Sequence, residues 1–158
     1  MVEIHNSVAK VYEENKETLE IFECLDEFSD TQNFCDHYGF DIEDSCNAIL
    51  IKAKKPEEFY AMFCVLGANR LDVNHKAKEA MGAKRVSFAS REEAEAVTGQ
   101  IYGGISPLGL PENIKVYMDK NVTDRKKLFI GAGNRVSKFF LSPETLIDLS
   151  SAKVLDLT

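Results

Sequence analysis

The sequence has little of what metal sites, disulfide scaffolds and membrane proteins are built from. It contains no tryptophan, four cysteines and three histidines among its 158 residues. No apolar run approaches the ~20 residues that a membrane span needs. The N-terminus is acidic where a secretory signal peptide would be basic and then apolar. We therefore expect a cytoplasmic protein without a membrane partner.

The cysteines and histidines are too dispersed to predict a metal site. No two cysteines form a C-x-x-C pair, and three of the four lie in apolar patterns. This favours buried free thiols over a disulfide or a zinc site. The residues concerned are Cys24, Cys35, Cys46, Cys64, His5, His37 and His75.

Charge is unevenly distributed along the chain. Residues 1–44 hold 13 acidic and 2 basic residues, a balance of −11, whereas residues 45–158 hold 13 acidic and 17 basic residues, a balance of +4. The net charge of −7 argues against general nucleic-acid binding. Either an anionic ligand binds the later part of the chain, or the acidic N-terminal part is a solvated helix and nothing more.

Length and composition predict a single globular domain over residues 1–158, since 44% of the residues are hydrophobic and 28% are charged. Capping residues and apolar periodicity predict its helices. These cover about 7–17 after Asn6, a short segment from Ser29 with Gln32 to Gly39, 72–81 from Asp72, 90–98 from Ser90 with Glu93, and a last helix from Ser142-Pro143.

Short apolar runs predict more strands than helices. The expected strands are 19–25, 46–54, 58–66, 83–89, 114–122, 127–133, 136–142 and 152–157. The runs 46–54 and 58–66 are most simply an antiparallel pair of central strands. The chain is therefore expected to be a mixed α+β domain built around a curled sheet.

Two glycine-rich stretches could hold a ligand. "GAGNRV" (131–136) resembles the start of a dinucleotide fingerprint, but Val136 stands where the last glycine should be, and a strand follows instead of a helix, which favours a tight turn. "GQIYGGISPLGLP" (99–111) has no charged side chain. It is either a plain surface loop or a loop that binds a carbonyl or carboxylate through main-chain N–H groups.

Three blocks of sequence resemble the YbaK/prolyl-tRNA-synthetase-associated editing domain. They are "GANRLD" (67–72), "GAKRVSFASREEAEAVTG" (82–99) and "GGISPLGLP" (103–111). They are similar to that family's R-x-D-type strand end, its S-x-E-E…TG helix and its G-x-x-x-P loop. The similarity extends over about residues 29–157, and the chain is identified as a member of the family.

The resemblance implies a mixed, curled, barrel-like β-sheet flanked by helices. It also implies hydrolysis, without a cofactor, of the ester of tRNA wrongly charged with alanine, cysteine, serine or threonine, by a free-standing protein or a synthetase domain. The partners would be the tRNA acceptor end and an aminoacyl-tRNA synthetase. Main-chain donors would stabilise the oxyanion, and a vicinal ribose hydroxyl would assist the attack of water. The implied residues are Asn47, Gly103, Gly104, Ser106 and Pro107 for catalysis and Ile105, Arg70, Gly131 and Gly133 for substrate binding.

Asn47 departs from the family pattern, which has a lysine before the first long central strand. An asparagine offers neutral hydrogen bonds, which are weaker than those of an ammonium group. Three interpretations remain: Asn47 adapts the site to another amino acid, the protein binds an aminoacyl-tRNA end or an aminoacyl-like molecule without hydrolysing it, or Asn47 is structural.

Four further residues have alternative roles. Arg70 and Asp72 form an ion pair at a strand end, or else Asp72 caps a helix. Gly131 and Gly133 either border the pocket or form a turn.

The densest basic run is Arg125, Lys126 and Lys127. It either contacts tRNA phosphates or is simply solvated.

Overall fold

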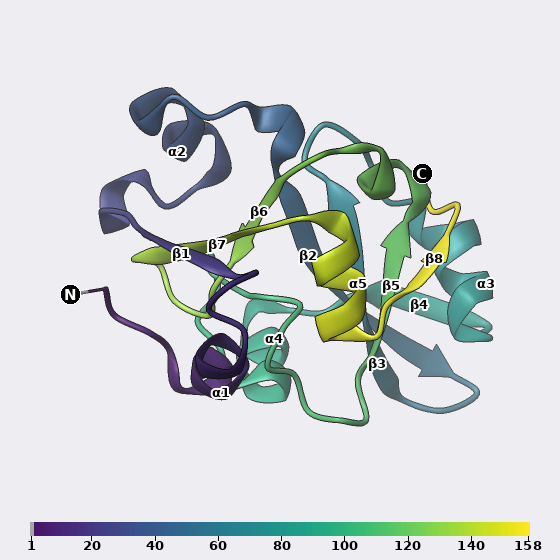
Figure 1. Ribbon diagram of the computed structural model, residues 1–158. Coiled ribbons are helices and arrows are strands. Elements are labelled where there is room, and N and C mark those ends of the chain that lie inside the picture. Colours follow the sequence, from purple (N-terminus) through teal and green to yellow (C-terminus); the bar gives the residue numbers. More distant parts are fainter. Residues whose placement is uncertain (1) are drawn as a thin grey trace.

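The computed structural model describes residues 2–158 (Figure 1). Its α-helices are α1 (Asn6–Glu14), α2 (Thr31–Tyr38), α3 (Lys78–Met81), α4 (Arg91–Thr98) and α5 (Pro143–Ser150). Its strands are β1 (Glu20–Glu23), β2 (Cys46–Lys55), β3 (Phe59–Leu66), β4 (Arg85–Phe88), β5 (Lys115–Asp119), β6 (Leu128–Gly131), β7 (Ser137–Leu141) and β8 (Lys153–Leu155). The predicted mixed α+β class is confirmed. Between residues 2 and 158, no helix has the length and hydropathy that crossing a bilayer requires.

The strands form two sheets, so the curled sheet does not close into a barrel. The larger sheet has the order β4-β2-β3-β5-β8; β2 is antiparallel to β3 and β4, and β5 is parallel to β3 and β8. The smaller sheet, β1-β7-β6, is antiparallel. A parallel bridge between Ser45 and Phe129 brings the start of β2 to β6. The two sheets therefore meet at that end of β2.

Two sequence-based predictions, one about strand pairing and one about a turn, are confirmed. The apolar runs 46–54 and 58–66 form the antiparallel pair β2–β3. Residues 132–136 join β6 to the antiparallel β7, so "GAGNRV" is a turn between strands.

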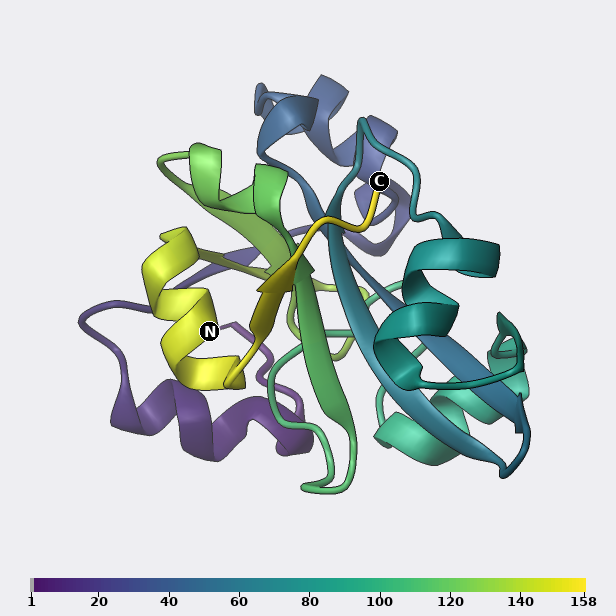
Figure 2. The same ribbon diagram turned by 90° about the vertical axis from the view of Figure 1, so that its right-hand side faces the viewer.

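Strand β3 is buried on both faces. Its even-numbered positions from 62 to 66 belong to the same core as Val8 of α1 and Leu146 of α5. Its odd-numbered positions from 61 to 65 pack with Ala77 and Met81. Figure 2 shows the corresponding layers, with α3 on one side of the larger sheet and α1 and α5 on the other. Burial on both faces explains why the β3 sequence is apolar throughout.

Most capping predictions hold. Ser90 and Glu93 form the predicted capping box of α4. Asp72 caps the turn that leads into α3, and Gly39, Gly82 and Gly99 end their helices in the left-handed conformation.

Two capping predictions are wrong by one residue. The cap of α1 is His5, whose ring Nδ1 accepts a hydrogen bond from the Ser7 N–H, and not Asn6. The cap of α2 is Asp30, which accepts from the Asn33 N–H at 2.9 Å, and not Ser29. In each case an adjacent side chain is a competent acceptor.

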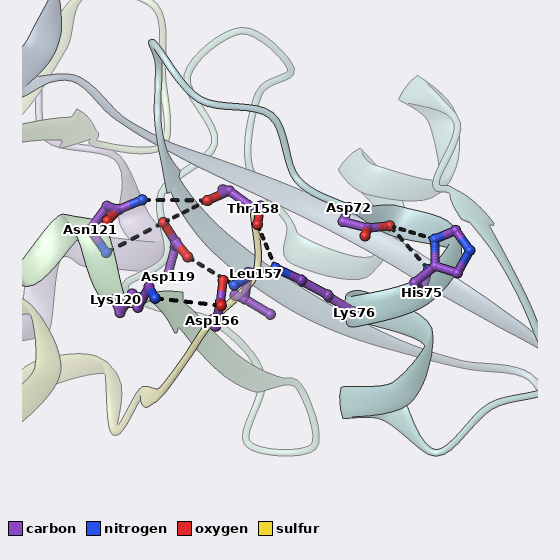
Figure 3. Close-up of polar contacts among 9 residues, drawn as sticks. All are labelled: Asp72, His75, Lys76, Asp119, Lys120, Asn121, Asp156, Leu157 and Thr158. Atoms are coloured by element: carbon purple, nitrogen blue, oxygen red, sulfur yellow. Dashed lines mark hydrogen bonds and ion pairs between the residues drawn. The ribbon is translucent and has the colours of Figure 1, made fainter.

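Polar contacts fix the end of the chain (Figure 3). The Asp119 carboxylate is fully buried and accepts from the Leu157 N–H at 2.8 Å. The Lys76 ammonium donates to Asp156 at 3.0 Å and to the Thr158 carbonyl at 2.6 Å. These contacts hold the segment after β8 against the larger sheet and the turn before α3.

Asp72 makes contacts within its own helical turn. Its Oδ1 lies 3.1 Å from both the backbone nitrogen and the ring Nδ1 of His75, as drawn in Figure 3. The structure places no ion pair between Arg70 and Asp72, so the capping role holds and the ion-pair alternative is wrong.

An aromatic cluster joins α2 to the smaller sheet. Phe34 of α2 is fully buried and stacks on Phe40 with ring centroids 5.2 Å apart. It also contacts Phe22, Phe129 and Phe140 from the three strands of that sheet. We call these five residues the aromatic cluster. It positions the N-terminal end of α2 beside the meeting point of the two sheets.

Candidate functional site

A cavity of about 520 Å³ lies where the two sheets meet. It is bordered by the start of β2, the end of β4, the strands β6 and β7, the N-terminal end of α2 and the glycine-rich loop. The lining residues are 29–31, 45–50, 88–89, 94, 102–105, 129–131 and 138. Segments that lie far apart in the sequence therefore form one site.

The glycine-rich loop forms one wall through its backbone. Gly103 has φ +93°, a conformation that favours glycine, and the Gly104 N–H donates to the Ile101 carbonyl at 2.9 Å. The Gly104 carbonyl accepts from the Gly133 N–H at 2.6 Å. A side chain on Gly104 would collide with the Asn134 carbonyl, and one on Gly131 with the Ile105 carbonyl. These close approaches fix the loop against the β6–β7 turn.

Two main-chain donors of this loop remain unused. Within residues 2–158, the N–H groups of Gly103 and Ile105 have no hydrogen-bond acceptor, whereas the intervening Gly104 N–H is paired. Both residues line the cavity. The loop therefore has two free main-chain N–H groups, each of which can donate to a ligand oxygen.

The loop residues Ser106 and Pro107 do not line this cavity. Ser106 is fully buried; its hydroxyl accepts from the Leu108 N–H at 3.1 Å, and its own N–H donates to Gln100 Oε1 at 2.5 Å. Pro107 borders a separate hollow. Gln100, which the sequence does not single out, also donates to the Leu108 carbonyl at 2.9 Å. Ser106 and Gln100 thus shape the loop from behind.

Asn47 lines the cavity from β2. Its Oδ1 accepts a hydrogen bond from the Ser45 hydroxyl at 3.3 Å. Its neighbour Cys46 is buried, and a hydrogen bond with Cys64 together with burial raises the pKa of the Cys46 thiol well above 9.0. Cys46 is therefore protonated at neutral pH and unsuited to act as a nucleophile.

The lysines of β2 lie outside the cavity lining, so none of them supplies a cation in place of the neutral Asn47. Lys52 lies outside the cavity lining, and its ammonium contacts Glu93 Oε2 at 2.7 Å. The same carboxylate oxygen accepts from the Tyr60 hydroxyl at 2.9 Å. Hydrogen bonds from Lys52, the Ser90 backbone and Tyr60 lower the pKa of Glu93 from 4.5 to about 2. This network fastens α4, and with it the loop that follows, to β2 and β3.

We expect Glu93→Gln to lower the melting temperature at neutral pH, because the ionised carboxylate is stabilised only in the folded state. A carboxyl group whose pKa is depressed stabilises the fold above its unfolded value and loses that contribution as pH falls through its folded value. The difference in unfolding free energy between Glu93→Gln and wild type should therefore be present above about pH 4.5 and vanish toward about pH 2. Urea unfolding across this range measures it, with the exposed Glu92→Gln as the matched control; equal effects of both variants would contradict the network.

Lys138 is a cavity residue that sequence reasoning missed. It comes from β7, is 7% exposed, and donates to the Ser29 carbonyl at 2.9 Å. Burial lowers its pKa below 10.5. The signal in the sequence is a lysine within the apolar run "VSKFFLS" (136–142), but the run does not show that this position faces a cavity.

Most of the remaining predicted site residues lie outside the cavity. Arg70 is exposed and does not line it, and Gly133 supports the loop from the β6–β7 turn. Gly131 does line it.

The basic run 125–127 is largely paired with acidic residues of the N-terminal part. Arg125 donates to Asp44 at 2.8 and 3.0 Å, and Lys127 contacts Glu20 at 3.0 Å. Lys126 is exposed and has no ion pair within residues 2–158. Part of the charge asymmetry of the sequence is therefore neutralised inside the fold.

No group of His, Cys, Asp and Glu in the described part of the chain could hold a metal ion. The four cysteines are buried and free, as predicted.

The sequence that forms this fold also matches a known protein family. The family of aminoacyl-tRNA editing domains matches residues 26–149, and the chain belongs to this family. The resemblance inferred from the sequence is thereby confirmed.

Two individual relatives match shorter parts of the chain than the family does. A candidate Cys-tRNA(Pro)/Cys-tRNA(Cys) deacylase of Enterococcus faecalis, EbsC, is 30% identical over 92 residues, 58% of this chain and 56% of that protein. The proline–tRNA ligase of Streptococcus suis is 42% identical over 57 residues, 36% of this chain and 9% of the ligase. The chain thus matches about half of the first protein and a small part of the second.

A solved structure matches over almost the entire length. A candidate trans-editing enzyme for prolyl tRNA synthetase has a TM-score of 0.83 and 23% identity, covering 99% of each chain. At this identity, the match establishes the shared fold.

Proposed function

We propose that this protein hydrolyses the ester bond of mischarged aminoacyl-tRNA in trans, and that residues 1–158 act as one editing domain. The observation that carries the proposal is the pair of unused N–H groups, on Gly103 and Ile105, in a cavity of about 520 Å³. The family and the names of the relatives support the substrate class.

The proposed reaction uses the backbone and the substrate. Water attacks the ester carbonyl carbon, and the N–H groups of Gly103 and Ile105 donate to the oxygen that becomes negative. A vicinal ribose hydroxyl orients the water and relays a proton to the leaving ribose oxygen. The bond between the carbonyl carbon and the ribose oxygen breaks, which releases the amino acid and tRNA.

Several residues would position the tRNA end. Phe88 and Tyr102 line the cavity and are 62% and 49% exposed, so a terminal base could stack on either ring. Asn47 would supply neutral hydrogen bonds to the ribose or the amino acid. Lys126 remains available for a phosphate contact, and an aminoacyl-tRNA synthetase would be the partner that delivers the tRNA.

A second candidate function is binding of an aminoacyl-tRNA end without hydrolysis. Asn47 favours it, because no charge-assisted hydrogen bond can come from this position.

The decisive experiment compares wild type, Asn47→Ala and Asn47→Lys on a panel of mischarged tRNAs. We expect wild type to release at least one amino acid. Asn47→Ala should lower kcat/KM for it by about two- to tenfold, the value of one neutral hydrogen bond. Rates of ester hydrolysis are the readout. Turnover by Asn47→Lys alone would support the binding function, and no turnover by any of the three would reject hydrolysis.

A further inference from the structure

Lys138 is a buried cation without a counter-ion. Within residues 2–158, no carboxylate lies within 4 Å of its ammonium nitrogen, whose hydrogen-bond acceptor is the neutral Ser29 carbonyl. The Phe34 ring lies 5.0 Å from the ammonium group. Asp30 is the nearby acid, but its oxygens accept from the Asn33 N–H at 2.9 Å and from Asn33 Nδ2 at 2.6 Å. A buried ammonium that has a carbonyl and a ring beside it but no counter-ion is still costly, so a binding role would explain why it is there.

Next to it lies a hydroxyl group that also lacks a partner. Ser29 is 1% exposed, lines the same cavity, and its Oγ has no hydrogen-bond partner within residues 2–158. An ammonium group carries three donors, and one of those of Lys138 is used by the Ser29 carbonyl. Two N–H donors and one O–H donor therefore remain on this wall of the cavity.

The position of Lys138 in the sheet relates it to the glycine-rich loop. Lys138 pairs directly with Gly131 across β7 and β6. Side chains of paired residues leave the same face of a sheet, and a side chain on Gly131 would run into the loop carbonyls of Gly104 and Ile105. Lys138 thus emerges on the face that carries the loop, so its donors and the unused loop donors belong to one site.

We propose that Lys138 and the Ser29 hydroxyl form a subsite for a negatively charged oxygen of the aminoacyl-tRNA end. The inference rests on the proposed function for the identity of the ligand. Two oxygens of that ligand have this chemistry, namely the oxyanion that forms at the ester carbonyl and a phosphate oxygen of the terminal nucleotide. Charge-assisted hydrogen bonds to either would offset the cost of burying the ammonium group.

The first test is the hydrolysis of aminoacyl esters by Lys138→Met and Ser29→Ala. Two substrates separate the sources: an alanyl ester of adenosine and the same ester carrying a 5′-phosphate. Lys138→Met should lower kcat/KM by about ten- to hundredfold. A loss on both substrates, in kcat, identifies the oxyanion; a loss confined to the phosphorylated substrate identifies the phosphate. Ser29→Ala should act on the same substrate with a smaller effect.

Stability separates binding from a structural role. Lys138→Met removes a buried charge, so its melting temperature should be no lower than that of wild type. The control Lys120→Gln removes an exposed lysine that contacts Asp156 at 3.5 Å, and should leave the hydrolysis rate unchanged. Unchanged rates in Lys138→Met, or equal losses in Lys120→Gln, would overturn the subsite.

A measurement on the wild type completes the test and does not depend on turnover. Binding of AMP, or of an adenosine aminoalkylphosphonate that imitates the tetrahedral anion, is followed through the NMR signal of the Lys138 ammonium group. We expect one of them to shift this signal and to bind at least tenfold more weakly to Lys138→Met. A shift without ester hydrolysis by wild type would reject the proposed function and keep the subsite. Hydrolysis by the wild type, without any shift of the Lys138 signal and without any loss of probe affinity in Lys138→Met, would overturn the subsite. A failure of both probes to bind the wild type would also overturn it.

Discussion

Gly104→Ala is expected to lower ester hydrolysis about hundredfold or more. The added Cβ would collide with the Asn134 carbonyl, a backbone atom that cannot turn away, so the loop must move off the β6–β7 turn. This displaces the flanking N–H groups of Gly103 and Ile105, and the loss of one oxyanion donor typically costs about 10²–10³ in kcat. Overpacking should also cost about 1–3 kcal/mol of folding free energy. Single-turnover hydrolysis and urea unfolding measure the two effects.

The matched control is Gly82→Ala at the end of α3. Gly82 has φ +63°, but a Cβ there meets no atom within 4 Å. Its replacement should cost about 1 kcal/mol from the left-handed backbone alone and leave hydrolysis intact. If Gly104→Ala hydrolyses its ester as fast as this control, the loop donors have no catalytic role.

Phe34→Ala should cause the largest loss of stability, about 3–5 kcal/mol. Phe34 is fully buried at the centre of the aromatic cluster, so its removal leaves a cavity that the surrounding rings cannot fill. For a domain of this size, the melting temperature should fall by about 10 °C. Calorimetry measures the change.

The control for this substitution is Phe59→Ala, at a position that is 39% exposed at the start of β3. It should cost much less, because its ring is partly solvated already. Equal losses in the two variants would show that the aromatic cluster is not a centre of stability.

Local features of this fold can be predicted from the sequence, because their cause is local. The capping box of Ser90 and Glu93 needs only two side chains three positions apart, and the helix end at Gly99 needs only a residue that adopts positive φ. Where two adjacent residues can both cap, as at Ser29 and Asp30, the pattern does not decide between them; in the structure Asp30 caps the helix and Ser29 is buried.

The candidate site is less predictable, because it depends on contacts between distant segments. The sequence identifies Gly103, Gly104 and Asn47, because glycine content and a departure from a family pattern can be read without a structure. All three line the cavity. Ser106 lies in the same motif but faces the interior, and Lys138 lines the cavity from a strand 91 positions after Asn47. The packing of the two sheets decides which side of a buried strand borders a cavity. A local sequence pattern therefore cannot predict it.

The parallel pairing of β3 with β5 has a consequence for how this site comes into being. Met62 pairs with Val116, 54 residues later, and the intervening chain includes α3, β4, α4 and the glycine-rich loop. The entropy of closing so long a segment must be overcome before the pair forms, which makes such contacts slow to appear. The hairpin β2–β3 can assemble early, whereas the loop reaches its binding geometry only when the crossover has closed and the β6–β7 turn is in place. The capacity to bind a ligand would then arise late in folding, together with the complete core.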